Sequence, residues 1–166
     1  VREFRSERLP PQVLSNLLWA AFGINRPESG KRTAPSAVNR QEMDIYVAMK
    51  DGLYLYDAKG HRLQPVLAED IRTLTGRDTF VREAPLNLIY VADFARMGSS
   101  SDQNKIFYSA ADTGFISQNV YLYCASEGLG TVVRGGVDRN ALQATMKLRP
   151  EQRVVLAQTV GYPKQK

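Results

Sequence analysis

The longest apolar stretch of the chain covers residues 103–127 and predicts a single long helix. Its apolar residues keep roughly helical spacing at Phe107, Ala111, Phe115, Leu122 and Cys124. Further apolar side chains fall on the other faces, and a helix that is apolar all round is normally enclosed. We therefore expect a buried central helix, capped at its start by Ser101 or Asp102.

A membrane-spanning helix is the alternative interpretation of this stretch. Asp112, Gln118 and Asn119 lie near its middle, where a bilayer makes each polar side chain costly. Small residues such as Ala110 and Gly114 instead allow a close approach by another helix or chain. We expect no membrane span.

Amphipathic spacing predicts a first helix over residues 12–22, because leucines line one face and Pro11 stands where a helix start tolerates proline. Gly23 ends this helix. Residues 25–41 are rich in turn formers and in basic side chains. Loops of this length inside a compact domain are usually functional or disordered, and we expect this one to contribute little to the core.

Strand patterns follow the loop. Residues 43–49 and 53–56 alternate around Asp51-Gly52 and predict a hairpin with a two-residue turn. Residues 61–65 are expected to add a short third strand.

The second half of the chain predicts two more apolar strands and several short elements. The unbroken apolar run at 85–92 fits a buried central strand, and residues 153–160 fit a last strand. We also expect a helix over residues 68–74, a strand and a glycine turn over 128–136, and a short helix over 138–146 that Asp138 caps.

Composition fits one globular domain over residues 1–166, since 43% of the residues are hydrophobic and 23% are charged. The net charge of +5 favours an anionic partner. Basic residues are scattered and not interleaved with aromatics, so a phosphate-bearing cofactor fits as well as a nucleic acid. The chain starts at Val1, so we expect an upstream segment to have been removed or left out, and a soluble protein in the cytoplasm or exported fits equally well.

Single copies of two reactive residue types limit the chemistry. Cys124 is the only cysteine, which excludes an intrachain disulfide and a cysteine metal cluster, and it is expected to be a small buried hydrophobe. His61 is the only histidine and lies in a turn, so neither a histidine metal site nor a Ser–His triad is well supported. Asp112 and Glu127 are expected to be structural or solvated.

Four stretches together resemble the FMN-dependent nitroreductase family. Residues 1–4 resemble the end of its Arg-x-Ser-x-Arg opening, and residues 34–41 resemble its Pro-Ser-x-x-Asn-x-Gln loop. Residues 128–138 resemble its helix–strand–glycine segment, and residues 161–164 resemble its C-terminal end. The four occur in the family's order over essentially the whole chain.

The resemblance has two departures. The first Arg and the Ser of the opening motif would precede Val1, so part of the family's phosphate site is missing from this sequence. Glu42-Met43 stands where the family usually has Pro-Trp, which affects the contacts expected for substrate or nicotinamide.

The resemblance implies an α+β fold, in which helices flank a central mixed or antiparallel sheet around a long buried helix, and a homodimer that binds FMN at each end of its interface. Arg2 would lie at the pyrimidine edge of the flavin, and Lys164 and Lys166 would bind the phosphate. Backbone and side-chain contacts to the cofactor are implied for Pro35, Ser36, Ala37, Asn39, Val133, Arg134, Gly135 and Gly136. Of these, Pro35, Ser36 and Asn39 would reach the flavin of the partner subunit.

The resemblance also implies the reaction. The protein would take hydride from NADH or NADPH onto FMN and pass electrons to a nitroaromatic, a quinone or a related small acceptor. Flavin carries its own reactivity, so no catalytic side chain and no metal are expected. Two alternatives stay open: a peptide thiazoline or oxazoline dehydrogenase of the same fold, and a non-enzymatic module that binds anions.

Overall fold

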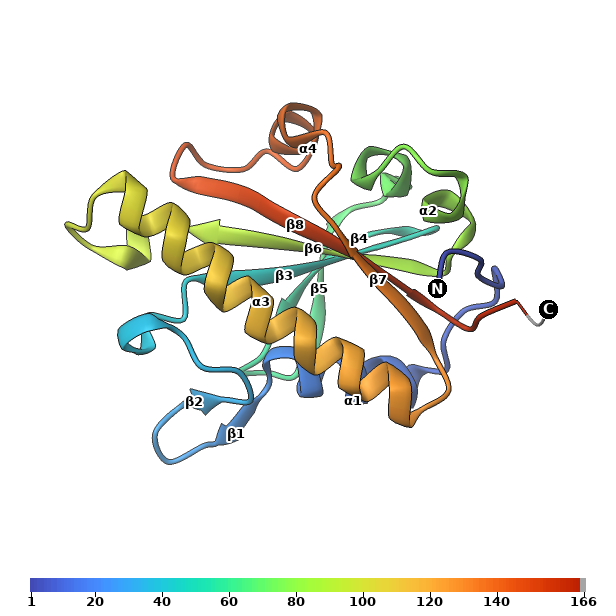
Figure 1. Ribbon diagram of the computed structural model, residues 1–166, viewed down its shortest axis with the longest axis horizontal. Helices are drawn as coiled ribbons and strands as arrows, with labels where there is room; N and C mark the ends of the chain where they lie inside the picture. Colours follow the sequence, from blue (N-terminus) through green and yellow to red (C-terminus); the bar gives the residue numbers. More distant parts are fainter. Residues whose placement is uncertain (165–166) are drawn as a thin grey trace.

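Six strands form one antiparallel sheet at the centre of the computed structural model, which describes residues 1–164 (Figure 1). Their order across the sheet is β5-β4-β3-β6-β8-β7. The strands are β3 (Met43–Met49), β4 (Gly52–Asp57), β5 (Arg62–Leu67), β6 (Leu86–Asp93), β7 (Gly130–Arg134) and β8 (Gln152–Gly161). A separate small hairpin joins β1 (Ile24–Arg26) to β2 (Lys31–Arg32).

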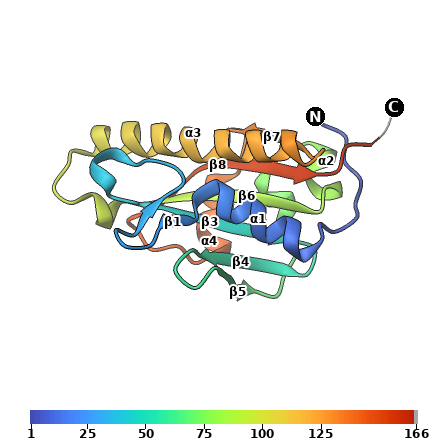
Figure 2. The same ribbon diagram turned by 90° about the horizontal axis from the view of Figure 1, so that it is seen from below.

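Helices cover both faces of the sheet. The α-helices are α1 (Pro11–Phe22), α2 (Thr79–Glu83), α3 (Asp102–Ser126) and α4 (Arg139–Thr145), and the 3-10 helices are η1 (Ala37–Asn39), η2 (Arg72–Thr75) and η3 (Phe94–Met97). Helices α1 and α3 pack on one face, and η2 and α4 pack on the other (Figure 2). The fold is therefore α+β with helices on both sides of a sheet, as the resemblance implies.

Strand β6 shows why the apolar run at 85–92 has no alternation. All eight of its residues are buried. Leu88 and Tyr90 belong to the core under α1 and α3, whereas Ile89 and Val91 belong to the core under η2 and α4. Because successive side chains point to opposite faces, a strand covered on both sides must be apolar throughout.

Helix α3 lies along the sheet, but this chain does not enclose it. Its buried stripe is made largely of small and polar side chains: Ser109, Asp112, Thr113, Ile116, Ser117, Val120 and Cys124. Phe107, Phe115 and Leu122 point outward with 65%, 49% and 62% of their surfaces exposed. The expectation that the chain itself surrounds this helix was therefore wrong, since the aromatic positions form its outer face.

None of the helices in residues 1–164 combines the length and the hydrophobicity that crossing a bilayer requires. In α3, polar groups of the inner face are satisfied locally. The Thr113 hydroxyl, for example, donates to the Ser109 carbonyl at 2.6 Å.

Most long elements lie where the sequence places them, within one or two residues. Ser101 caps α3 by accepting from the Asn104 N–H, and Asp138 caps α4 by accepting from the Ala141 N–H. The helix expected at 68–74 was wrong, because only the 3-10 turn η2 forms there. Five short elements were missed: β1, β2, η1, α2 and η3. Elements of two to five residues are too short to show a period.

Candidate functional site

A cleft of about 960 Å³ opens where β7 ends. Residues 73–82, which contain the end of η2 and most of α2, form one wall, and residues 136–140 form the other. Three exposed arginines (Arg77, Arg82 and Arg139) and two exposed aspartates (Asp78 and Asp138) line the cleft, so its lining carries a small excess of positive charge. The segments that flank it lead to the helices labelled α2 and α4 in Figure 1.

Gly136 lines the cleft next to the end of β7, and Gly135 comes directly before it in the chain. Both are exposed, and a Cβ added at Gly136 would meet no atom within 4 Å. A Cβ at Gly135 would meet only Leu156, at 3.8 Å. Within residues 1–164 neither glycine N–H donates a hydrogen bond, although the Gly135 carbonyl accepts one from Arg139 at 3.2 Å. Two backbone donors are therefore available at this edge of the cleft.

The Arg134 side chain turns away from the cleft and into the protein. One guanidinium nitrogen donates to Asn87 and to Thr159, each at 3.0 Å, and the other donates to the Thr75 carbonyl. Burial lowers the pKa of Arg134 to about 10. The resemblance implies Arg134 as a cofactor residue, and for its backbone this stays a prediction; its side chain packs behind Gly135 on the inner side of the sheet end.

Gly76 is not among the site residues that the sequence suggests, but the packing of Arg134 requires a glycine at this position. The Arg134 guanidinium occupies the space that a Cβ at Gly76 would need. Only glycine therefore leaves room for this arginine under the cleft wall. The sequence signal is a glycine shortly after the helix expected at 68–74, and a glycine in that position by itself predicts no more than the end of a helix.

Arg2 and the described part of the C-terminal tail lie near each other. The Arg5 N–H donates to the Tyr162 carbonyl at 2.9 Å, and the Lys164 N–H donates to the Glu3 carbonyl at 3.1 Å. Arg2 is exposed, and its charge contributes to the lowered pKa of Arg134. The Lys164 ammonium donates to Glu83 at 3.0 Å, and Lys166 lies outside the described residues.

The loop that contains Pro35, Ser36, Ala37 and Asn39 lies elsewhere, beside the N-terminal half of α3 (Figure 1). The Ala37 N–H donates to the Asp112 carboxylate at 2.9 Å, and Ser36 Oγ accepts from the Gln41 N–H at 2.9 Å. Val38, the most exposed large apolar residue of the loop, is 86% exposed. A single chain therefore brings Arg2, Val133, Gly135 and Gly136 to one region and this loop to another.

Glu42 and Asp112 form a buried acidic pair that sequence reasoning missed. Glu42 is 0% exposed and Asp112 is 2% exposed. Burial, together with the neighbouring Asp112 carboxyl, raises the pKa of Glu42 to about 7. The expectation that Asp112 is structural fits its bond to Ala37, and Glu127 is exposed at the end of α3.

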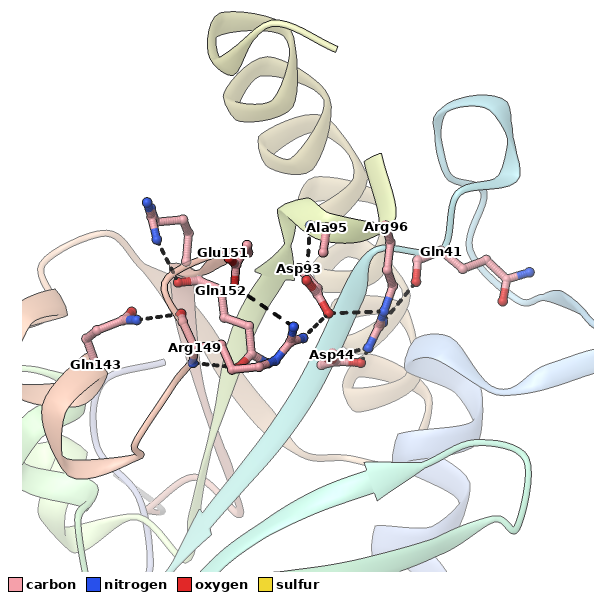
Figure 3. A network of polar contacts seen from close by, with 10 residues as sticks. Gln41, Asp44, Asp93, Ala95, Arg96, Gln143, Arg149, Glu151 and Gln152 are labelled. Carbon is pink, nitrogen blue, oxygen red and sulfur yellow. Dashed lines mark hydrogen bonds and ion pairs between the residues drawn. The ribbon is translucent and has the colours of Figure 1, made fainter. Parts of the chain in front are cut away.

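An ion-pair network closes the opposite end of the sheet (Figure 3). The Asp93 carboxylate accepts from Arg149 at 2.5 Å and lies 3.4 Å from the Arg96 Nε. Arg96 also binds both oxygens of Asp44, each at 2.9 Å, and donates to the Gln41 carbonyl at 3.2 Å. The opposite charges of this network pair with one another. We therefore interpret it as a structural network that holds the end of the loop at Gln41 in place.

One serine–histidine contact exists outside these regions. Ser15 Oγ lies 2.7 Å from His61 Nε2, and the Tyr56 hydroxyl lies 2.9 Å from His61 Nδ1. Ser15 stands inside α1, where backbone N–H groups are used by the helix and cannot stabilise an oxyanion. The contact ties α1 to the exposed turn between β4 and β5. Within residues 1–164, no cluster of three or more His, Cys, Asp and Glu is placed to hold a metal.

Comparison with known proteins gives a family match over almost the whole chain. Residues 1–162 match the family described as the nitroreductase family. A candidate nitroreductase of Methanocaldococcus jannaschii is 31% identical over 159 residues, which cover 90% of this chain and 80% of that protein.

Solved structures agree with this match. A candidate nitroreductase from Ralstonia eutropha superposes with a TM-score of 0.95 at 44% identity, covering all of this chain and 79% of the other. A chain of the Escherichia coli microcin synthetase complex superposes with a TM-score of 0.86 at 20% identity, covering 98% and 68%. The NADPH:FMN oxidoreductase of Vibrio harveyi superposes with a TM-score of 0.72 at 19% identity, covering 99% and 65%.

Proposed function

The chain belongs to the nitroreductase family, and from this premise we propose that it is an FMN-dependent oxidoreductase. It takes hydride from NADH or NADPH and passes electrons to a nitroaromatic, a quinone or a related small acceptor. Family membership supports an oxidoreductase that uses a flavin. The choice of FMN, the nicotinamide donor and the acceptor class are the proposed part.

The observation that carries the proposal is the open cleft beside two glycines whose backbone donors are unused. A flavin ring is flat and carries hydrogen-bond acceptors at N5 and O4 along one edge. Gly135 and Gly136 let the backbone come close to such an edge, because no Cβ stands between the N–H groups and the ligand. When bound, FMN supplies the redox chemistry, and the protein supplies binding, orientation and charge.

Other residues of the chain would orient and tune the cofactor. Arg2, near Arg134, offers a fixed positive charge to the pyrimidine edge. Lys164 offers an ammonium to the phosphate once its exposed ion pair with Glu83 exchanges, and Lys166 is proposed to join it. Residues 35–39 would complete the site of a second subunit, since they lie far from the cleft of their own chain.

The proposal is tested by colour, affinity and reduction. The purified protein should be yellow or should bind added FMN, and NADH or NADPH should bleach the bound flavin without air. A colourless protein with no affinity for FMN would overturn every flavin proposal and would favour the anion-binding alternative.

A second candidate is dehydrogenation of a thiazoline or oxazoline ring in a peptide. The fold is compatible with it, since this chain superposes well on a chain of a microcin synthetase complex. Both candidates need FMN, so they differ in which compound reduces the bound flavin. A flavin that NADH and NADPH leave oxidised, but that a peptide azoline reduces, would favour the second candidate.

A further inference from the structure

A buried carboxyl group without a partner stands next to the loop at residues 35–39. Glu42 is 0% exposed and comes directly before β3. Neither of its carboxyl oxygens has a hydrogen-bond partner within residues 1–164. A charged carboxylate is costly in such a place, because burial removes its water and nothing replaces it.

The main chain around Glu42 is firmly held. Its carbonyl accepts from the Asp93 N–H at 2.9 Å, and the Gln41 carbonyl accepts from Arg96 at 3.2 Å. Arg96 is itself bound to Asp44 and Asp93, as Figure 3 shows. The backbone therefore cannot shift the Glu42 carboxyl towards solvent without breaking these bonds.

The polar group that faces Glu42 is the Asp112 carboxyl, in the middle of α3. Two ionised carboxylates are both acceptors, so they repel and cannot bond to each other. A single proton turns the contact into an O–H···O hydrogen bond. Asp112 already accepts from the Ala37 N–H at 2.9 Å, whereas both Glu42 oxygens lack a partner within residues 1–164, so we place the proton on Glu42.

We propose that Glu42 is a positioning residue whose neutral carboxyl donates a hydrogen bond to the Asp112 carboxylate, and that this buried pair holds residues 35–39 in place through Ala37. The pair acts on the loop and does not touch the cofactor. Its effect on cofactor binding rests on the proposed function, in which this loop reaches the flavin of a second subunit.

The proton of this pair is lost near neutral pH. Burial and the Asp112 carboxyl raise the pKa of Glu42 to about 7, while the Arg40 charge acts in the opposite direction. Arg96 lies nearby, but Asp44 and Asp93 engage its guanidinium. As the pH rises through about 7, the folded protein acquires a second buried negative charge, and the hold on Ala37 weakens.

Hydrogen exchange at the Ala37 amide tests the pair in cofactor-free protein. Its protection, corrected for the intrinsic exchange rate, should fall about tenfold between about pH 6 and about pH 8.5 in the unaltered chain. Glu42→Gln keeps a neutral donor at every pH and should abolish this fall. Glu127→Gln, the same change at an exposed site on α3, should leave it unchanged.

Protection that does not change with pH in the unaltered chain, or that falls equally in Glu42→Gln, would overturn the proposal. If Glu42→Gln does not fold, Glu42→Met removes the ionisable group at similar length and should also abolish the fall.

FMN affinity over the same pH range separates this inference from the proposed function. Affinity should fall in the unaltered chain and stay constant in Glu42→Gln. If the Ala37 amide shows the expected pH dependence in a protein that does not bind FMN, the Glu42–Asp112 hydrogen bond would be supported and the proposed FMN-dependent function would be overturned. If hydrogen exchange at the Ala37 amide depends on pH but FMN affinity does not, the positioning role of Glu42 in cofactor binding would be overturned.

Discussion

The Ala37 backbone N–H donates a 2.9 Å hydrogen bond to the Asp112 carboxylate, and this bond joins an exposed loop to the middle of α3. The acceptor is buried, and its other neighbour is the unpaired carboxyl of Glu42. The buried Asp112 carboxylate therefore links the position of residues 35–39, which are proposed to contact the cofactor, to the protonation state of Glu42.

Asp112→Asn should reduce the pH dependence that Glu42 imposes on stability, because it removes the Asp112 contribution and leaves that of burial. The pKa of Glu42 is about 7 in the folded protein and 4.5 ordinarily, so its stabilising contribution is complete below about pH 4.5 and is lost as the pH rises to about 7. The loss is up to about 3 kcal/mol, at about 1.4 kcal/mol for each pH unit. The introduced amide can still accept from Ala37, and it offers an N–H to an ionised Glu42.

Urea unfolding at several pH values gives the free energy of unfolding of the unaltered chain and of Asp112→Asn. The difference between the two free energies removes the contributions of the carboxyl groups that both proteins share. Glu127→Gln serves as the control. Parallel stability curves for the unaltered chain and Asp112→Asn would show that burial alone, and not the Asp112 carboxyl, sets the pH dependence that Glu42 imposes.

Gly136→Val should weaken FMN binding at least tenfold while the protein stays folded. A Cβ at Gly136 meets no protein atom within 4 Å, so the added side chain enters the cleft and not the core. Titration with FMN and circular dichroism measure the two effects. Ala144→Val adds similar bulk to an exposed position on α4 outside the cleft and should bind FMN normally. Equal affinity in Gly136→Val would place the flavin elsewhere.

Arg2→Ala should lower the reduction potential of the bound flavin. A positive charge at the pyrimidine edge favours the anionic reduced ring, and about 30 mV is lost for each 1.4 kcal/mol of differential stabilisation in a two-electron couple. Lys164→Ala should instead weaken FMN binding in both redox states alike, because the phosphate charge does not change.

Spectroelectrochemical titration beside FMN affinity separates the two roles. Glu83→Gln, which frees Lys164 from its ion pair, should leave the potential unchanged. Loss of cofactor in Arg2→Ala with an unaltered potential would mean that Arg2 only holds the flavin.

Phe115→Arg should convert a dimer to a monomer. The outer face of α3 exposes Phe107, Phe115 and Leu122, and a second copy of this chain would bury them. Sedimentation of the unaltered protein at low concentration should show a dimer, and the variant should dissociate at least tenfold more readily. Val66→Lys, which charges an exposed apolar site on the edge strand β5, should remain dimeric. A folded, flavin-loaded monomer of the unaltered chain would refute this prediction.

Local patterns in the sequence were enough to place most of the long elements. The continuous run in β6, the alternating hairpin of β3 and β4, and the caps at Ser101 and Asp138 all depend on neighbouring residues, so each could be recognised without a partner. The motifs that resemble the nitroreductase family are likewise local, and the match over residues 1–162 confirms that family.

Tertiary structure decided which face of each element is buried. Helix α3 has apolar residues on every side, so its sequence alone could not show that Ile116 packs inward while Phe115 stays exposed. Arg134 looked like a cofactor residue, and its inward turn became visible only with Thr75, Asn87 and Thr159 around it. Glu42 looked like an ordinary substitution in a motif, and only the approach of α3 sets Asp112 beside it. Burial and pKa are properties of contacts between distant segments, and those contacts exist only once the chain has folded.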